Sequence, residues 1–232
     1  MSLPKIDLPL YPVTIPSTGK ETTFRPFTVK EEKILLIAQE SKDIDQVITA
    51  IKQIINNCVT GVNVDELSTF DCDYLLIQIR ATSVSNVMEF RISDPDTEEK
   101  IDIEVDAEEI TVFTPEGHSK FIKINDTNTI VMKYPSIEEF YKSLSNQDKS
   151  KQFEFMLSCV ESIVMGDEIH KLKDYSEEEI LEFFDGLTGS TIEQIGNFFD
   201  TMPRLRLEHK YVSDGKEKTF VIQGTETFFQ SR

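Results

Sequence analysis

The segment "FRPFTVKEEKILL" (residues 24–36) marks the junction between a strand and a helix near the start of the chain. Pro26 lacks a backbone N–H and cannot continue a sheet ladder, so it ends the strand. Thr28 and Glu31 have the spacing of a capping box, in which the hydroxyl accepts from the backbone N–H three residues on and the carboxylate reaches back to the cap. The junction therefore predicts a helix that begins at Thr28.

The residues before this helix predict a β-hairpin over positions 8–27. Two apolar segments flank the polar turn "STGK", which contains a glycine suited to a tight reversal. Phe24 and Phe27 are predicted to be buried at the corner between hairpin and helix, and Arg25 is predicted to face outward. The corner is thus expected to be a structural feature.

Two further helices are predicted before residue 86. The first begins near Lys42, and seven apolar residues in it recur at three- and four-residue spacing, which is typical of one buried helical face. These residues are Ile44, Val47, Ile48, Ile51, Ile54, Ile55 and Cys58. The second begins at the cap-like segment "STFD" (68–71).

From residue 86 to about 134 the apolar period changes to two, which predicts an antiparallel meander. Its polar face carries Asp102, Glu104 and Asp106. The turn "DPDTEEKIDIEV" begins like a calcium-binding loop, but its sixth and twelfth positions are Glu99 and Val105, where such a loop needs glycine and a bidentate carboxylate. We interpret it as a charged hairpin turn.

The last hundred residues are predicted to be mainly helical, with a closing hairpin. Helices are expected from Ser136 and over 151–165, 176–186 and 190–201, with cap spacings at Ser136/Glu139, Ser176/Glu179 and Ser190/Glu193. The fold class is α+β. The predicted domains are 1–134, with hairpin, helices and meander, and 135–232, mainly helical; because no linker separates them, they are either two domains or one body.

Composition narrows the classes of function. Asp and Glu number 42 against 24 Lys and Arg, and the net charge is -18. Such a chain repels phosphates, so neither nucleic acid nor an anionic membrane is an expected partner; the charge serves either solubility or a basic protein partner. No secretory signal is recognisable, and no apolar run reaches the ~18 residues of a membrane span. Three widely spaced cysteines indicate reduced thiols in a cytoplasm.

No catalytic or metal-binding motif is present. His118, His170 and His209 are far apart and have neither a helical HExxH nor a CxxC motif beside them, so no metal or cofactor is expected. The cysteines lack a neighbouring base, and neither a nucleophile elbow nor a phosphate-binding loop occurs. The sequence therefore predicts a protein that is not an enzyme.

One short run has the composition of a protein interface. Adjacent aromatics are followed by methionine and two arginines, residue types that are enriched where proteins meet. The candidate partner-binding residues are Phe198, Phe199, Met202, Arg204 and Arg206. The alternative is an ordinary closing hairpin whose arginines pair with carboxylates of the same chain.

Three segments resemble the baseplate hub assembly proteins of T-even-type contractile-tail bacteriophages. They are "TFRPFTVKEEKILL" (23–36), "PEGHSKFIKINDTNTIVMKYPS" (115–136) and "NFFDTMPRLRLEHKY" (197–211), and the similarity extends over nearly the whole chain. The first is the most specific, because FRPF followed by KEEK is no general helix cap.

The resemblance implies a phage protein that acts in the host cytoplasm during virion assembly. It would bind other baseplate hub or tail proteins during tail morphogenesis, either as a chaperone-like helper or as a minor hub component that stays in the virion. The resemblance supplies no active-site residues. The alternative function is an acidic phage protein that binds a host target protein.

Overall fold

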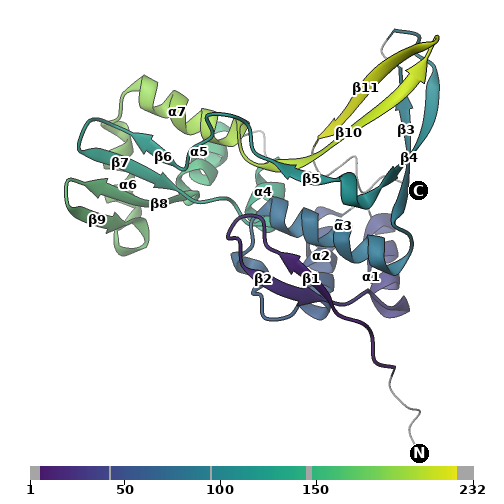
Figure 1. The fold of residues 1–232 in the computed structure, drawn as a ribbon. Helices are drawn as coiled ribbons and strands as arrows, with labels where there is room; N and C mark the ends of the chain where they lie inside the picture. Colours follow the sequence, from purple (N-terminus) through teal and green to yellow (C-terminus); the bar gives the residue numbers. More distant parts are fainter. Residues whose placement is uncertain (1–5, 42, 95, 145–147, 224–232) are drawn as a thin grey trace, which may run out of the picture. The chain divides into compact units, whose positions relative to one another are not determined.

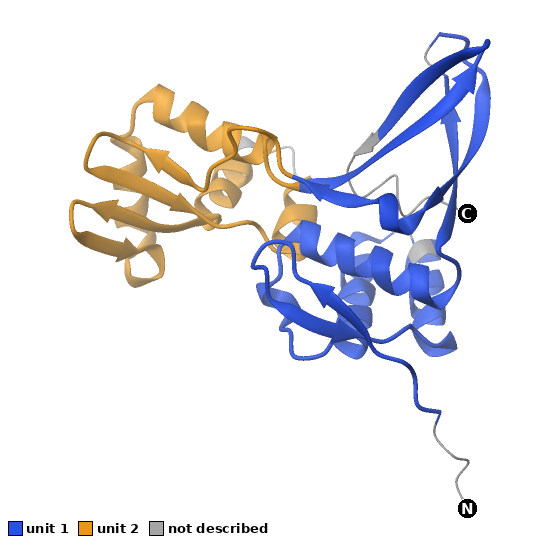
Figure 2. Cartoon of the chain, viewed as in Figure 1, with its two compact units in different colours: residues 1–113, 204–232 blue, residues 114–203 orange. Residues whose placement is uncertain are grey.

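The computed structural model describes residues 6–41, 43–94, 96–144 and 148–223, and it is an α+β structure, as predicted. The chain forms two compact units (Figures 1 and 2). Unit 1 contains residues 1–113 and 204–232, and unit 2 contains residues 114–203. Unit 2 is thus an insertion within the chain of unit 1.

The predicted N-terminal hairpin is present in unit 1. Strand β1 (Tyr11–Thr14) pairs antiparallel with β2 (Glu21–Phe24). Residues that follow the second helix extend this small sheet: Phe24 bridges to Val59, and the Thr60 N–H donates to the Thr23 carbonyl at 2.9 Å. Two regions some 35 positions apart in sequence are thereby joined through backbone hydrogen bonds.

Three helices follow in unit 1, namely α1 (Val29–Ser41), α2 (Ile44–Cys58) and α3 (Thr69–Ser83), with a 3-10 turn, η1 (Val64–Glu66), before α3. Most of the predicted apolar stripe of α2 is buried, although Ile44 at its start is exposed. A capping box of Ser68 and Asp71 begins α3, and the buried Asp71 carboxylate also accepts from the Ser17 N–H at 2.8 Å. The cap of α3 therefore also holds the turn of the N-terminal hairpin.

Two small antiparallel sheets complete unit 1. One pairs β3 (Val87–Ser93) with β4 (Lys100–Asp106); the other has the order β11-β10-β5, with β5 (Thr111–Phe113), β10 (Arg204–Ser213) and β11 (Lys216–Gln223). The short η2 (Ala107–Glu109) separates β4 from β5. Their inward side chains share one apolar cluster with α3: Ile77, Met88, Phe90, Ile92, Ile103, Val105, Ala107, Ile110, Leu205, Leu207 and Tyr211.

The antiparallel strands predicted over 86–134 are present, but they do not form one meander. The strands lie close to the predicted segments, but β5 pairs with β10, about 90 residues later, and the next two strands belong to unit 2. Alternating polarity identifies a half-buried strand without identifying its partner, because the period of two is the same in every sheet. The partner of β5 depends on long-range packing.

Unit 2 is a four-stranded antiparallel sheet with helices. The strand order is β6-β7-β8-β9, formed by β6 (Phe121–Lys123), β7 (Asn128–Met132), β8 (Val160–Met165) and β9 (Glu168–Lys171). The helices are α4 (Ile137–Leu144), α5 (Lys149–Ser158), α6 (Glu177–Asp185) and α7 (Gly189–Asp200), and η3 (Leu172–Asp174) precedes α6. Buried residues of the sheet, α6 and α7 form its core.

The predicted helix over 151–165 is also wrong, because only its first half is helical. Helix α5 ends at Ser158, and "VESIVM" forms β8, which continues through a turn at Gly166 (φ 62°) into β9. β-branched residues favour strands, and the left-handed conformation of Gly166 suits a tight reversal. The first half of this segment follows a helical pattern, whereas the second half does not.

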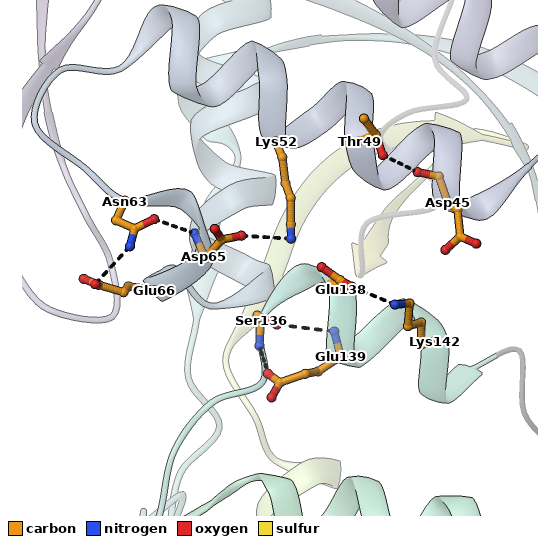
Figure 3. A network of polar contacts seen from close by, with 10 residues as sticks. All are labelled: Asp45, Thr49, Lys52, Asn63, Asp65, Glu66, Ser136, Glu138, Glu139 and Lys142. Atoms are coloured by element: carbon orange, nitrogen blue, oxygen red, sulfur yellow. Dashed lines mark hydrogen bonds and ion pairs between the residues drawn. The ribbon is translucent and has the colours of Figure 1, made fainter.

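Two of the predicted caps in unit 2 are present. Ser136 with Glu139 and Ser176 with Glu179 make the reciprocal contacts of capping boxes (the first is drawn in Figure 3). The cap expected at Ser190 is instead Thr188, whose side chain accepts from the Thr191 N–H. Thr188, Ser190 and Thr191 all have side chains that can cap a helix, so the sequence alone does not decide at which of them the helix begins.

The units divide the chain at positions other than the expected boundary at residue 134. The second unit begins at residue 114, and residues 204–232 return to the first. The physical reason is the pairing of β10 with β5, which places the C-terminal hairpin in the core of unit 1. The part predicted to be helical from residue 135 onward contains two strands, β8 and β9. Strand β8 pairs with β7 on one side and with β9 on the other.

Phe24→Ala should lower the free energy of unfolding of unit 1 by about 3–5 kcal/mol, because the ring is only 2% exposed and its loss leaves a cavity. Leu10→Ala is the matched control, since Leu10 in the same unit is 62% exposed and should change stability by less than about 0.5 kcal/mol. Urea unfolding followed by circular dichroism measures both. Equal midpoints for the two variants would contradict the structural role of Phe24.

Candidate interaction surfaces

The corner at FRPF is held by a buried carboxylate. Glu31 is 3% exposed and accepts hydrogen bonds from the Thr28 N–H at 2.8 Å, from the Thr28 hydroxyl and from the Arg25 guanidinium at 3.1 Å. Asn57 of α2 adds a longer contact of 3.4 Å. The carboxylate half of the predicted capping box is therefore confirmed, and it also ties α1 to α2.

The predicted orientation of Arg25 is wrong. Its side chain is about three-quarters buried and forms an ion pair with Glu31, because an otherwise unpaired buried carboxylate would be costly. Phe24 is buried as predicted, whereas Phe27 is only half-buried, and its N–H donates to the Ser83 hydroxyl at 2.8 Å. The corner is a polar junction as well as an apolar one.

The environment of Glu31 changes its titration. Burial by itself raises the pKa of this carboxyl, but the hydrogen bonds from Thr28 and Arg25, together with the Arg25 charge, outweigh burial and lower the pKa to about 2. Glu31 is thus ionised throughout the physiological range. The charge is fixed in place as part of the fold.

In unit 2, His118 lies in a stack of aromatic rings. Its ring centroid is 5.3 Å from that of Phe198 and 5.7 Å from that of Tyr134, and its two nitrogens contact the Thr201 hydroxyl at 3.0 Å and the Tyr134 hydroxyl at 2.9 Å. Burial, and secondly the charge of Lys120, lower the pKa of His118. The imidazole is therefore neutral at pH 7, and both nitrogens are engaged within the fold.

The five predicted partner-binding residues lie in different environments. Phe198 belongs to the buried core of unit 2, and Phe199 is half-buried beside it, with its ring 5.4 Å from that of Phe155. Met202 is also buried, whereas Arg204, the first residue of β10, is exposed. The structure therefore does not gather the five side chains on one exposed surface.

Arg206, the fifth of these residues, contacts groups of its own chain. Its guanidinium carbon lies 4.2 Å from the centroid of the Phe113 ring, on the neighbouring strand β5, and it forms an ion pair with Glu208. Lys210, further along β10, pairs with Glu217 at 3.0 Å. These contacts are those expected for a closing hairpin, which was the alternative interpretation of this run.

The charged turn between β3 and β4 is confirmed as a hairpin turn. Asp94 is buried, and its carboxylate accepts from the Asp96 and Thr97 N–H groups, from the Tyr211 hydroxyl at 3.1 Å and from the Lys218 ammonium at 2.8 Å. The bond to Lys218 is the main cause that lowers the pKa of Asp94, and it raises that of Lys218. This contact joins the β3–β4 turn to the C-terminal hairpin.

The exposed face of β3 and β4 is acidic, as predicted. Asp102 accepts a two-pronged contact from Arg91, at 2.6 and 2.9 Å, but Glu104 stands directly opposite Glu89 in the register. Like charges in a cross-strand pair destabilise a sheet. This face therefore has unfavourable electrostatics that a basic partner would relieve.

Unit 2 contains a cleft of about 700 Å³ between α5, β8, η3 and α6. Apolar residues such as Leu157, Val160 and Ile180 line it together with charged groups of both signs: Lys133, Lys171, Lys173, Glu154, Glu161 and Glu177. Three positive and three negative side chains balance each other. The cleft thus shows no preference for a ligand of either charge.

Polar contacts at α2 and α4 fix local turns (Figure 3). In unit 1, Lys52 of α2 forms an ion pair with Asp65 of η1 at 2.9 Å, and Asn63 caps η1 through the Asp65 N–H. In unit 2, Lys142 pairs with Glu138 one turn earlier in α4, at 2.7 Å. The first group joins the middle of α2 to η1, and the second lies within α4.

The structure brings together no recognisable metal site within the described residues, where no group of three or more His, Cys, Asp or Glu is arranged to hold an ion. The three thiols are buried, and burial raises the pKa of Cys58 to about 11 and that of Cys159 to about 12, so both are protonated at pH 7. Of the helices in the described ranges, none is both long and apolar enough to span a membrane.

The chain is therefore an α+β protein in which buried carboxylates such as Glu31 and Asp94 connect separate elements. Its exposed features include the acidic face of β3 and β4. The sequence matches the model of a family described as T4 bacteriophage base plate protein over residues 8–230. The chain therefore belongs to this family of T4-type phage baseplate proteins. Searches of curated proteins and of solved structures gave no match.

Sequence reasoning missed the long-range contacts of the buried carboxylates, among them those of Asp94 and Glu31. Asp94 and Lys218 are 124 positions apart, and Glu31 and Asn57 are 26 apart, so no local spacing connects them. For Glu31 the available signal was the cap spacing, which indicated that its carboxylate would be engaged. Nothing in the sequence alone indicated that the carboxylate would also recruit Arg25 and Asn57.

Glu31→Gln should remove a pH-dependent contribution to stability. The pKa of Glu31 falls from about 4.5 in the unfolded chain to about 2 in the folded one, which corresponds to roughly 3 kcal/mol. Because the folded-state pKa is the lower one, this stabilisation is complete above pH 4.5 and is lost as pH falls towards 2. Urea unfolding of the variant and the wild type from pH 7 to pH 2.5 measures the difference.

The stability difference between the two proteins should thus shrink over that interval. Glu32→Gln is the control, because Glu32 is the exposed neighbour on the same helix. A constant difference between Glu31→Gln and wild type across the whole range would contradict the ionised, hydrogen-bonded state of Glu31.

Proposed function

We propose that this protein is a non-catalytic factor in baseplate hub assembly, which binds other hub or tail proteins during tail morphogenesis. The observation that carries the proposal is the family match over residues 8–230. The resemblance of residues 23–36, 115–136 and 197–211 to hub assembly proteins supports the more specific role at the hub. The site of action is the host cytoplasm, and the finished baseplate is a second location.

The chemistry of the described side chains supports a binding role. The nitrogens of His118 and the carboxylates of Glu31 and Asp94 are all engaged in contacts that hold the fold. Cys58 and Cys159 are buried and protonated at pH 7. These groups therefore act as structural anchors, which leaves the surfaces for partner proteins.

A second candidate function is binding of a basic host protein. The acidic face of β3 and β4 favours it, because the opposed Glu89 and Glu104 would gain from a cationic partner. The two functions differ in the identity of the partner. One experiment can therefore separate them.

The test is affinity purification of the tagged full-length protein from infected cells, with partners identified by mass spectrometry. Enrichment of hub or tail proteins over other virion proteins is the expected outcome. A host protein as sole partner would replace the proposal with the second function. The control is the same tagged protein in uninfected cells, where only host partners are available.

A charge-reversal variant tests the predicted contribution of the C-terminal run. Arg204→Glu with Arg206→Glu should fold and should lose about tenfold in recovery of hub partners if these arginines contact them. Arg206→Glu alone is the comparison variant, because Arg206 is already paired with Glu208, whereas Arg204 is exposed. Normal partner recovery by a folded double variant would remove this run from the interface.

A further inference from the structure

Helix α1 carries apolar side chains on the side that faces away from its unit. Glu31 and Ala38 point inward and are buried, yet Val29, Leu36 and Ile37 are 65%, 53% and 64% exposed. At about 100° per residue, these three and the exposed Lys33 and Glu40 lie within an arc of about 100°. We call this set the α1 stripe.

The position of α1 leaves this stripe open within unit 1. Helix α1 packs against α2, and α2 packs against α3, so α1 is the outer helix of the three (labelled in Figure 1). A groove of about 370 Å³ between α1 and α2, lined in part by Ile34, Ile37 and Ala50, borders the stripe. A helix with apolar residues on both its inner and its outer side is typical of one that contacts a partner on the outer side.

The order of residues in the stripe indicates which partner fits. A two-fold axis between Leu36 and Ile37, perpendicular to α1, would pair the helix antiparallel with α1 of a second copy. Leu36 then lies at the level of Ile37 of the second copy, and Lys33 at the level of its Glu40. Val29, at the start of α1, lies at a level beyond Ser41, the last residue of the partner's α1, and has no α1 residue opposite it.

The central levels of this arrangement, which lie within α1, are complementary. Apolar residues meet apolar residues, and Lys33 meets a carboxylate on both sides of the axis. An isologous contact requires this kind of self-complementarity, because the same patch is used twice.

We propose that the α1 stripe binds a second copy of this chain, as an antiparallel α1–α1 homodimer. This proposal goes beyond the proposed function and does not depend on it. One pair of 13-residue helices buries less than the ~800 Å² per partner of a stable complex, so the dissociation constant should be on the order of 10–100 µM. Dimerisation is therefore expected at high local concentration.

Sedimentation velocity of the full chain from about 1 to 500 µM tests the proposal. The mass of the wild type should rise from 26.6 kDa towards twice that value. Ile37→Asp should weaken association at least about a hundredfold. Ile169→Asp is the matched control: Ile169 in unit 2 is 66% exposed, much like Ile37, and its replacement should leave the association unchanged.

Two charge variants test the antiparallel register itself. Lys33→Glu and Glu40→Lys, each alone, place like charges opposite each other and should weaken self-association about tenfold. An equimolar mixture of the two single variants should associate as well as the wild type, because every pair across a mixed dimer is again of opposite charge. Circular dichroism establishes that each variant is folded.

A wild type that stays monomeric at 500 µM would overturn the proposal and leave the stripe to a different protein. A dimer that folded Ile37→Asp does not weaken would also overturn it, because the contact would then lie elsewhere. Failure of the mixed charge variants to restore association would rule out the antiparallel register. None of these outcomes depends on binding to hub proteins, so the proposed function is tested separately.

Discussion

The pairing of β10 with β5 determines how this chain is organised. Only three residue pairs make the contact, from Arg204 opposite Phe113 to Arg206 opposite Thr111. They join segments some 90 positions apart. The chain therefore passes from β5 into unit 2 and returns from unit 2 into the neighbouring strand β10. The loop-closure entropy of bringing them together grows only slowly with length, at about 0.6 kcal/mol per doubling, and the burial of Leu205 and Leu207 can offset it.

Buried carboxylates supply further connections within unit 1. Glu31 joins α1 to the hairpin corner and to α2, Asp71 joins α3 to the first turn, and Asp94 joins the β3–β4 turn to the C-terminal hairpin. Each accepts several hydrogen bonds, as buried ionised groups require. In a chain of net charge -18, most carboxylates face water, and a few are used as internal anchors.

Local patterns in the sequence predicted the elements better than their assembly. The N-terminal hairpin, the stripe of α2 and the caps at Ser136 and Ser176 depend on residues close in sequence, and these predictions were confirmed. The meander failed because a period of two does not choose between β4 and β10 as the neighbour of β5. The orientation of Arg25 was predicted wrongly for a similar reason. It depends on the Glu31 carboxylate, which becomes buried only when α1 has folded.

The predicted partner-binding run also shows that local sequence does not determine long-range packing. Aromatic and arginine composition singled out residues 198–206, but composition does not reveal which side of a helix or strand is covered. Phe198 packs in the core of unit 2, and Arg206 lies over Phe113. Part of the exposed face of α1 lies within residues 24–36, yet an apolar run such as "ILLI" (34–37) does not reveal which of its side chains face inward.

The insertion of unit 2 also sets an order of events on the ribosome. All core residues of unit 2 have been synthesised once residue 203 is made, whereas the core of unit 1 still lacks Leu205, Leu207 and Tyr211. At about 5–20 residues per second, the 90 residues of unit 2 take roughly 5–20 s to synthesise. During that interval β10 and β11 are absent, so the apolar side chains of β3 and β4 that pack with Leu205, Leu207 and Tyr211 stay partly uncovered until the last hairpin emerges.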